Sequence, residues 1–243
     1  MYCYEYLKSV LEKNEDVLEI GCGEGYGSFI ISEMVRHVTA LDNNSDVIKY
    51  AKSKYNKDNL DFVHVEGLTL PFTDSSFDTI VLFQVIEHIE KDEAFLKEIR
   101  RVLKNSGRLI LTTPNREHRL KPGQKPWYKH HVREYARKEL EDLLKSVFND
   151  VNNYSITARQ DIFIMQKKVS MLASNLKSLD FIGISRFVPF SIRRIIINLF
   201  VFLQSLFKNE VKQQDYRIKY SLKDYSVTSD FINCLDFLAI CKK

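Results

Sequence analysis

Hydrophobic residues in the first half of the chain alternate between two spacings. Short apolar runs, which are typical of buried strands, are separated by segments whose apolar residues recur at helical spacing. The predicted strands span residues 16–20, 38–41, 60–65, 77–83 and 107–113. The predicted helices span residues 4–11, 28–37, 46–55 and 92–103. This alternation predicts a parallel sheet with helices on both faces.

The second half of the chain is less regular. A helix is predicted at 137–147, and strands are predicted at 151–157 and 237–241. Between these two strands lies a long insertion, residues 160–230, which we expect to be mostly helical. Because 243 residues suffice for one domain and are few for two, we expect a single domain over 1–243.

Charge and cysteine content narrow the class of protein. A net charge of +4 is mild and does not predict a nucleic-acid partner, which usually requires a concentrated basic face. Cys3, Cys22, Cys234 and Cys241 form no CxxC pair, and we expect all of them to be reduced thiols. Charged residues interrupt the N-terminal segment early, so we expect no signal peptide and predict a cytoplasmic location.

A glycine-rich loop follows the first predicted strand. The segment VLEIGCGEGYGS, residues 17–28, lies between a strand and a helix, where a ligand can meet both the helix N-terminus and close backbone. Asp42 ends the next strand, where a carboxylate can bind ribose hydroxyls. This arrangement predicts a ligand that contains adenosine.

Two residues of the loop discriminate between adenosine ligands. A dinucleotide fingerprint that starts at Gly21 needs glycine where Tyr26 stands. Glu19, two residues before Gly21, would repel a pyrophosphate but attract the ammonium group of a methionine moiety. Both observations disfavour a dinucleotide-dependent oxidoreductase.

The order of motifs resembles a known family. ExGCGxG, the acid after the second strand, LPF followed by SFD, EHI and KNSGRLILTTPN are similar to class I S-adenosylmethionine-dependent methyltransferases, and most of all to the methyltransferase type 11 group. The resemblance covers residues 17–115. It implies S-adenosylmethionine as cofactor and a Rossmann-like α/β fold. The implied sheet has seven strands in the order 3-2-1-4-5-7-6, with the last strand antiparallel and a helical insertion between the last two strands.

The same resemblance implies a cofactor site. Glu19, Gly21 and Gly23 would lie near the methionine portion, Asp42 on the ribose and Glu66 near the adenine, with Phe83 and Gln84 under the methionine part. The implied cofactor-binding residues are Glu19, Gly21, Cys22, Gly23, Gly25, Asp42, Asn43, Glu66, Gly67, Phe83 and Gln84.

Methyl transfer from a sulfonium mainly requires alignment of the acceptor and exclusion of water, and an oxygen acceptor often needs a general base as well. The predicted catalytic residues are Glu87, His88 and His131, and His130 is a further candidate beside His131. Each has a structural alternative, because Glu87 can cap a helix, His88 can shape the pocket wall, and the histidine pair can lie on an exposed loop.

A metal is an alternative for the same residues. Ubiquinone-pathway O-methyltransferases and small-RNA 3′-terminal 2′-O-methyltransferases bind a divalent cation and carry a carboxylate three residues before their EH pair. Here that position is Gln84, a poor replacement, so the sequence predicts no metal.

Two later segments bear on the methyl acceptor. TTPNREHR and HHVREYARKELEDLL, together with GEGYGS in the loop, resemble methyltransferases of surface-polysaccharide biosynthesis. They imply a small-molecule or lipid-linked glycan acceptor, methylated on a sugar oxygen. A quinone or lipid-like acceptor is the alternative, and a cofactor-binding module without catalysis is a third hypothesis.

The insertion contains a strongly apolar segment. Residues 190–208 read FSIRRIIINLFVFLQSLFK, preceded by Arg186, with Arg193 and Arg194 near the start. The uninterrupted apolar part is too short to span a bilayer. The segment therefore packs on the domain, covers a greasy acceptor, or lies at the inner face of the membrane through residues 186–208.

Overall fold

The computed structural model describes residues 2–126, 128–179 and 221–243. The apolar segment 190–208 and the arginines Arg186, Arg193 and Arg194 lie outside the described residues. Within the described residues, no helix is both long enough and apolar enough to cross a membrane.

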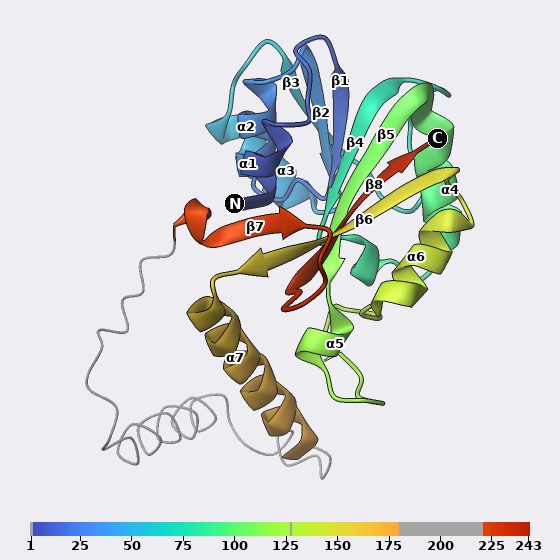
Figure 1. Cartoon of the computed structure of the whole chain (residues 1–243). Coiled ribbons are helices and arrows are strands. Elements are labelled where there is room, and N and C mark those ends of the chain that lie inside the picture. The colour runs from blue at the N-terminus through green and yellow to red at the C-terminus, as the bar shows by residue number, and fades with distance from the viewer. Residues whose placement is uncertain (1, 127, 180–220) are drawn as a thin grey trace.

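A single mixed sheet forms the centre of the fold (Figure 1). Its strands are β1 (Asp16–Ile20), β2 (His37–Asp42), β3 (Leu60–His64), β4 (Phe77–Phe83), β5 (Leu103–Pro114), β6 (Asp150–Ala158), β7 (Tyr225–Thr228) and β8 (Asp236–Lys242). Their order is β3-β2-β1-β4-β5-β8-β6-β7. β1 to β5 are mutually parallel, whereas β8 runs antiparallel to both β5 and β6.

This topology confirms the predicted fold class, with one difference. β8 takes the place of the predicted seventh strand, and the order of the first seven positions is as expected. The eighth strand, β7, lies inside the segment that was expected to be mostly helical. It pairs with β6 at the edge of the sheet, from Ser155 opposite Thr228 to Ala158 opposite Tyr225.

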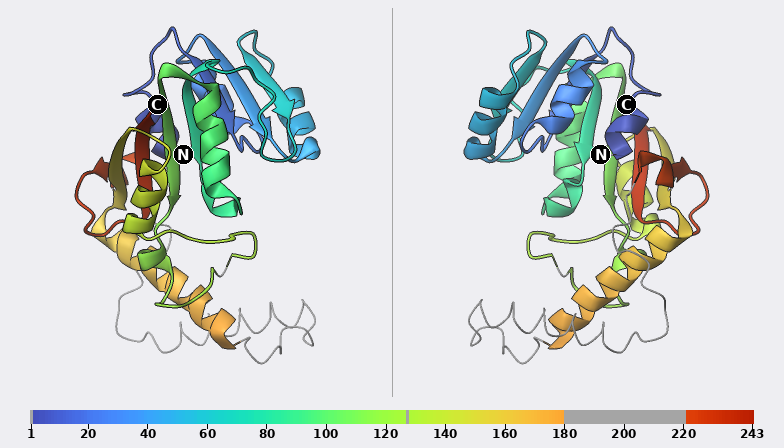
Figure 2. Two further views of the ribbon diagram at one scale, coloured as in Figure 1. Left: turned by 90° about the vertical axis from the view of Figure 1, so that its right-hand side faces the viewer. Right: turned by 90° about the vertical axis from the view of Figure 1, so that its left-hand side faces the viewer.

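Helices cover both faces of the sheet (Figure 2). The helices are α1 (Tyr2–Leu7), α2 (Tyr26–Ser32), α3 (Ser45–Lys54), α4 (Asp92–Val102), α5 (Arg116–Arg119), α6 (Arg137–Lys145) and α7 (Gln160–Leu179), with 3-10 turns η1 (Ile86–His88) and η4 (Leu222–Asp224). One hydrophobic cluster joins α1, α2 and α3 to the sheet, and another joins α4 and α6 to the opposite face.

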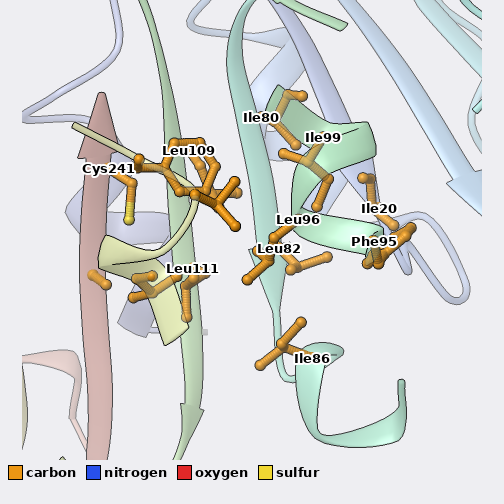
Figure 3. Close-up of a cluster of buried hydrophobic side chains, with 14 of the residues drawn as sticks. Ile20, Ile80, Leu82, Ile86, Phe95, Leu96, Ile99, Leu109, Leu111 and Cys241 are labelled. Carbon is orange, nitrogen blue, oxygen red and sulfur yellow. The ribbon is translucent and has the colours of Figure 1, made fainter. Parts of the chain in front are cut away.

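Alternation along the strands explains the two clusters. Val17, Val81 and Ile110 pack toward α1, α2 and α3, whereas their neighbours Leu18 and Ile80 pack toward α4 and α6. Successive strand residues point to opposite faces, so central strands covered on both faces are apolar throughout. Figure 3 shows the α4 side, where Phe95, Leu96 and Ile99 meet Ile80, Leu82 and Ile20. The strand pattern in the sequence is therefore typical of this two-sided core.

The start of α7 is held against the domain. Ile162 is fully buried, and the Phe163 ring lies 4.8 Å from the His118 ring of α5. Arg159, just before the helix, forms ion pairs with Asp161 and Asp224. These contacts place α7 beside the carboxyl end of β5, next to the loops that build the candidate site (Figure 1).

Candidate active site

The glycine loop turns sharply at the carboxyl end of β1. The amides of Gly21 and Cys22 both donate to the Leu41 carbonyl at the end of β2, at 2.8 and 3.0 Å. Gly21 has a left-handed φ of 76°, and a Cβ there would lie 2.5 Å from the Val85 side chain. The turn therefore requires glycine at this position on two independent grounds.

Asp42 ties the loop to the end of β2. Its Oδ2 accepts from the Gly23 amide at 3.0 Å, and its Oδ1 accepts from the Asn44 amide at 2.9 Å. Each oxygen has a further lone pair for a ligand. A carboxylate held in one orientation at the mouth of a cavity is a preorganised acceptor for ribose hydroxyls.

A cavity of about 520 Å³ opens at the carboxyl ends of β1, β2 and β4. Six predicted residues line it: Gly21, Asp42, Asn43, Gly67, Gln84 and His88. Apolar side chains, among them Leu41, Val65, Leu70 and Phe95, form further walls. Its volume lies in the range of about 300–1,000 Å³ that small-molecule sites occupy. Apolar walls beside a fixed carboxylate suit an adenosine ligand, so these residues fit S-adenosylmethionine.

Several residues implied by the resemblance lie around this cavity but do not line it. Cys22 is buried behind the loop, Gly25 is the residue before α2, and the Glu66 side chain is 80% exposed beside Gly67. The Phe83 ring packs against Tyr4 at 5.2 Å. Their contact with a cofactor stays a prediction.

Glu19 differs most from its predicted place. It is 1% exposed and points toward α1 and α2, where its carboxylate accepts hydrogen bonds from the hydroxyl groups of Tyr4 (2.8 Å) and Ser28. Burial raises its pKa to about 7. The Tyr4 ring occupies the space above Gly27, where a Cβ would lie 2.1 Å from the ring. The expectation that Glu19 faces the ligand cavity is not met, because α1 covers it.

The three predicted catalytic residues come together. One ligand atom from each of Glu87, His88 and His131 lies within 4.8 Å of the others. Glu87 is fully buried, and its Oε2 accepts from the Thr113 hydroxyl at 3.0 Å. Its Oε1 has no hydrogen-bond partner among the described residues, and burial raises the Glu87 pKa to about 7.

Both histidines are held through Nδ1. His88 Nδ1 lies 2.9 Å from the His130 carbonyl, and His131 Nδ1 lies 2.8 Å from Glu134 Oε1. A carbonyl only accepts, so His88 carries its proton on Nδ1 and offers the Nε2 lone pair. Burial, aided by nearby His88, lowers the pKa of His131 to about 4, which makes its imidazole neutral. Only His88 of the three lines the cavity.

The same cluster bears on a metal. Two imidazoles oriented through Nδ1 and one carboxylate are ligands that a divalent cation accepts. Gln84, the fourth position, donates its amide to Thr112 Oγ1 at 3.4 Å instead of offering a carboxylate. Three ligands therefore fit a cation and the fourth does not, and the prediction of no metal stays a prediction.

The structure adds residues that the sequence did not indicate. Tyr128, from the loop before α6, joins the wall of the cavity, where the further candidate His130 also lies. A second cavity of about 410 Å³ lies on the other side of Gln84. Its wall comes from α5, α7 and the start of β8, at Gln84, His118, Arg119, Met165, Gln166, Ser170, Leu235 and Asp236. Nothing in the local sequence around Asp236 indicates a site, because the fold alone brings it to β4.

Comparison with known proteins finds a family similarity in the first half of the chain. A family model described as a methyltransferase domain matches residues 18–111. Residues 18–111 are therefore similar to S-adenosylmethionine-dependent methyltransferases. The matched region contains the glycine loop, Asp42, Gln84 and His88, and S-adenosylmethionine is the cofactor that this similarity implies.

Curated relatives are similar to this chain over part of their length. A probable S-adenosylmethionine-dependent methyltransferase of Mycobacterium tuberculosis is 40% identical over 130 residues, which are 53% of this chain and 46% of that protein. A fatty-acid O-methyltransferase of Mycolicibacterium smegmatis is 35% identical over 98 residues, covering 40% of this chain and 36% of that protein. The chain thus spans about half the length of these curated relatives.

A solved structure shows the same fold over nearly the whole chain. The YcgJ protein of Bacillus subtilis superimposes with a TM-score of 0.61, covering 99% of this chain and 97% of that one, at 17% identity. At that identity the likeness shows the fold and nothing more specific.

Proposed function

We propose that the chain transfers a methyl group from S-adenosylmethionine to an oxygen atom of a sugar, free or carried on a lipid-linked glycan. The observation that supports this most directly is the bond from Gly23 to Asp42 at the mouth of the 520 Å³ cavity, because it sets a carboxylate where an adenosine ligand presents its ribose. When bound, S-adenosylmethionine supplies a methyl group already activated by its positive sulfur.

Different residues of the cavity would then bind different parts of the cofactor. Asp42 accepts from the ribose hydroxyls, and Leu41, Val65 and Leu70 cover apolar surface and exclude water. Gly21 and Gln84 lie on the side of β1 and β4, where the methionine part is expected. Glu19, under α1, contributes to the fold of the loop.

His88 is the member of the predicted catalytic trio that reaches the cavity. Its Nε2 lone pair accepts the proton of the acceptor hydroxyl, while the bond from Nδ1 to the His130 carbonyl stabilises the ring orientation. Glu87 and His131 pack behind it and position it. The Glu87 pKa near 7 allows that carboxyl to hold a proton beside the histidines.

A lipid-like or quinone acceptor is the second candidate, since one relative is a fatty-acid O-methyltransferase. The Asp236 carboxylate and the other hydrogen-bonding groups of the cavity beyond Gln84 suit the hydroxyl groups of a sugar. For the apolar segment 190–208 we propose peripheral contact with an anionic membrane surface, which would bring the site to a lipid-linked acceptor.

Two measurements test the proposed function. Calorimetry with S-adenosylmethionine, its demethylated product and NAD identifies the ligand, and we expect only the first two to bind. Transfer of a labelled methyl group into a cell extract then separates an enzyme from a silent binder. Binding of NAD alone, or binding of S-adenosylmethionine without any transfer, would contradict the proposal.

A further inference from the structure

Two cavities of the described residues share one side chain. Gln84 lines both the 520 Å³ cofactor cavity and the 410 Å³ cavity under α7. It directly follows β4 and has a left-handed φ of 56° although it is not glycine. The backbone amide of Gln84 donates to the Thr112 carbonyl at 2.9 Å, and this bond holds Gln84 in that conformation. Backbone strain of this kind persists where the surrounding structure imposes it, and such positions cluster at ligand sites.

The wall of the second cavity is mixed. Apolar atoms form the larger part of its surface, and among the described lining residues Gln84, His118, Arg119, Gln166, Ser170 and Asp236 bring hydrogen-bonding groups to it. Small-molecule sites are usually lined mainly by apolar side chains, with few polar groups. This mixed wall is typical of a small-molecule site, and its donors and acceptors suit a ligand that carries polar groups.

Among the described residues of that wall, Asp236 is the one carboxylate. It begins β8 opposite Pro114 of β5, and its side chain makes no hydrogen bond to another described residue. Burial raises its pKa to about 6, against the attraction of Arg119. Glu134, Glu87, Cys3 and Cys234 are the other titratable groups that interact with it. A carboxylate in a cavity wall that makes no hydrogen bond to the described residues can accept hydrogen bonds from a ligand at both of its oxygens.

α7 supplies the opposite side of the cavity. Gln166 and Ser170 are four positions apart and therefore lie on one face of the helix. The Gln166 amide reaches the Tyr225 hydroxyl at 3.4 Å, so the helix is joined to β7 as well as to α5. These polar groups face the cavity from a different element than Asp236 does.

We propose that the cavity under α7 is the methyl-acceptor site, and that Asp236 recognises a polyhydroxylated acceptor by accepting hydrogen bonds from two neighbouring hydroxyl groups. The proposal rests on the proposed methyl transfer and adds the place and the chemistry of acceptor recognition. Gln84, at the boundary, is where the acceptor oxygen meets the cofactor cavity.

The test uses the full chain, methyl-labelled S-adenosylmethionine and an unfractionated cell extract as the acceptor source. We expect the label in alkali-stable O-methyl sugars, identified after acid hydrolysis. Asp236→Asn keeps the shape but loses the charge, and we expect label incorporation to fall about 10- to 100-fold. Ser170→Phe fills the cavity from the α7 side and is expected to lower incorporation as well. Calorimetric affinity for S-adenosylmethionine should stay within about twofold in both variants, because neither residue lines the cofactor cavity.

Matched controls lie close by. Lys168→Phe places the same side chain on an exposed position of α7, and Asp150→Asn removes a carboxylate at the far end of the β6–β8 ladder. Both control variants should incorporate label like the unaltered chain.

Two results would overturn the acceptor site while leaving methyl transfer intact. One is unchanged incorporation in Asp236→Asn and Ser170→Phe, and the other is label recovered as alkali-labile methyl esters. Loss of cofactor affinity in folded Asp236→Asn would assign Asp236 to the cofactor site instead. Cofactor binding without incorporation by the unaltered chain would remove the proposed function, and this inference with it.

Discussion

The Gly23 amide donates a 3.0 Å hydrogen bond to the carboxylate of Asp42, which joins the loop after β1 to the end of β2. The two residues follow or end adjacent parallel strands, and Asp42 lines the 520 Å³ cavity. A single carboxylate thus shapes the loop and offers its remaining lone pairs to a ligand.

Replacement of Asp42 should weaken cofactor binding. Asp42→Ala removes a charged acceptor and leaves the Gly23 amide without its partner, so we expect an affinity loss of roughly 1.5–3 kcal/mol for S-adenosylmethionine by calorimetry. Asp46→Ala, which removes an exposed carboxylate four residues on, is the control and should bind normally. Unchanged affinity in a folded Asp42→Ala protein would contradict the placement of the cofactor site.

Replacement of His88 should separate chemistry from binding. His88→Asn removes the free Nε2, and we expect turnover to fall by about 10²- to 10⁴-fold while cofactor affinity stays nearly intact. His131→Asn should have a smaller effect on turnover, because its side chain is 7% exposed and acts through its neighbours. His37→Asn, on the amino-terminal end of β2, is the control. Turnover of the His88 variant at the unaltered rate would remove the base assignment.

The buried Glu19 should make stability depend on pH. Its pKa of about 7 lies above the ordinary value of 4.5, so the folded state holds the proton more tightly than the unfolded state. Its contribution to stability is complete below about pH 4.5 and is lost as the pH rises through about 7. We therefore expect Glu19→Gln to match the unaltered chain at pH 5 and to unfold with a free energy about 1–3 kcal/mol higher at pH 8.

Denaturant titrations at the two pH values measure this difference. Glu33→Gln, an exposed change just after α2, should show no such divergence. Glu87 and Asp236 also have raised pKa values, so the difference between variant and parent, rather than the parent curve alone, carries the result. A Glu19→Gln protein that loses stability at pH 8 would show that the ionised carboxylate is favoured under α1.

Methyl transfer should survive a strong chelator. Glu87, His88 and His131 supply three ligand atoms within 4.8 Å, but Gln84 occupies the fourth position with an amide. We expect the rate of label incorporation to be unchanged after treatment with EDTA and dialysis. Inhibition that Mg²⁺, Mn²⁺ or Zn²⁺ reverses would instead assign the cluster as a metal site.

The apolar segment 190–208 should bind anionic vesicles weakly at low salt. Each arginine near an anionic surface adds about 1 kcal/mol, and this attraction is screened by salt. Exchange of Arg186, Arg193 and Arg194 for glutamate should abolish flotation with phosphatidylserine vesicles. A wild-type protein that stays in the soluble fraction at low salt would leave the segment as a core or interface helix.

Local sequence determined the cofactor half of this protein. The strand, glycine loop, helix and acid that hold Gly21, Gly23 and Asp42 are neighbours along the chain, and one βαβ unit brings them together. The continuously apolar strands and the glycines with left-handed φ are likewise predicted by the local sequence pattern. The predicted strands 16–20 and 77–83 therefore coincide with β1 and β4.

Tertiary structure decided the features that depend on residues far apart in the sequence. Glu19 is turned from a ligand contact into a buried carboxyl because Tyr4 of α1 lies over it. β7 is a strand because the edge of β6 offers unpaired backbone groups to it. Asp236 and Gln84 are 152 positions apart in the sequence and line the same cavity. They do so only because β8 enters the sheet antiparallel between β5 and β6. Periodicity and motif spacing report on neighbours along the chain, whereas this cavity is made by a strand order that depends on the packing of the whole sheet.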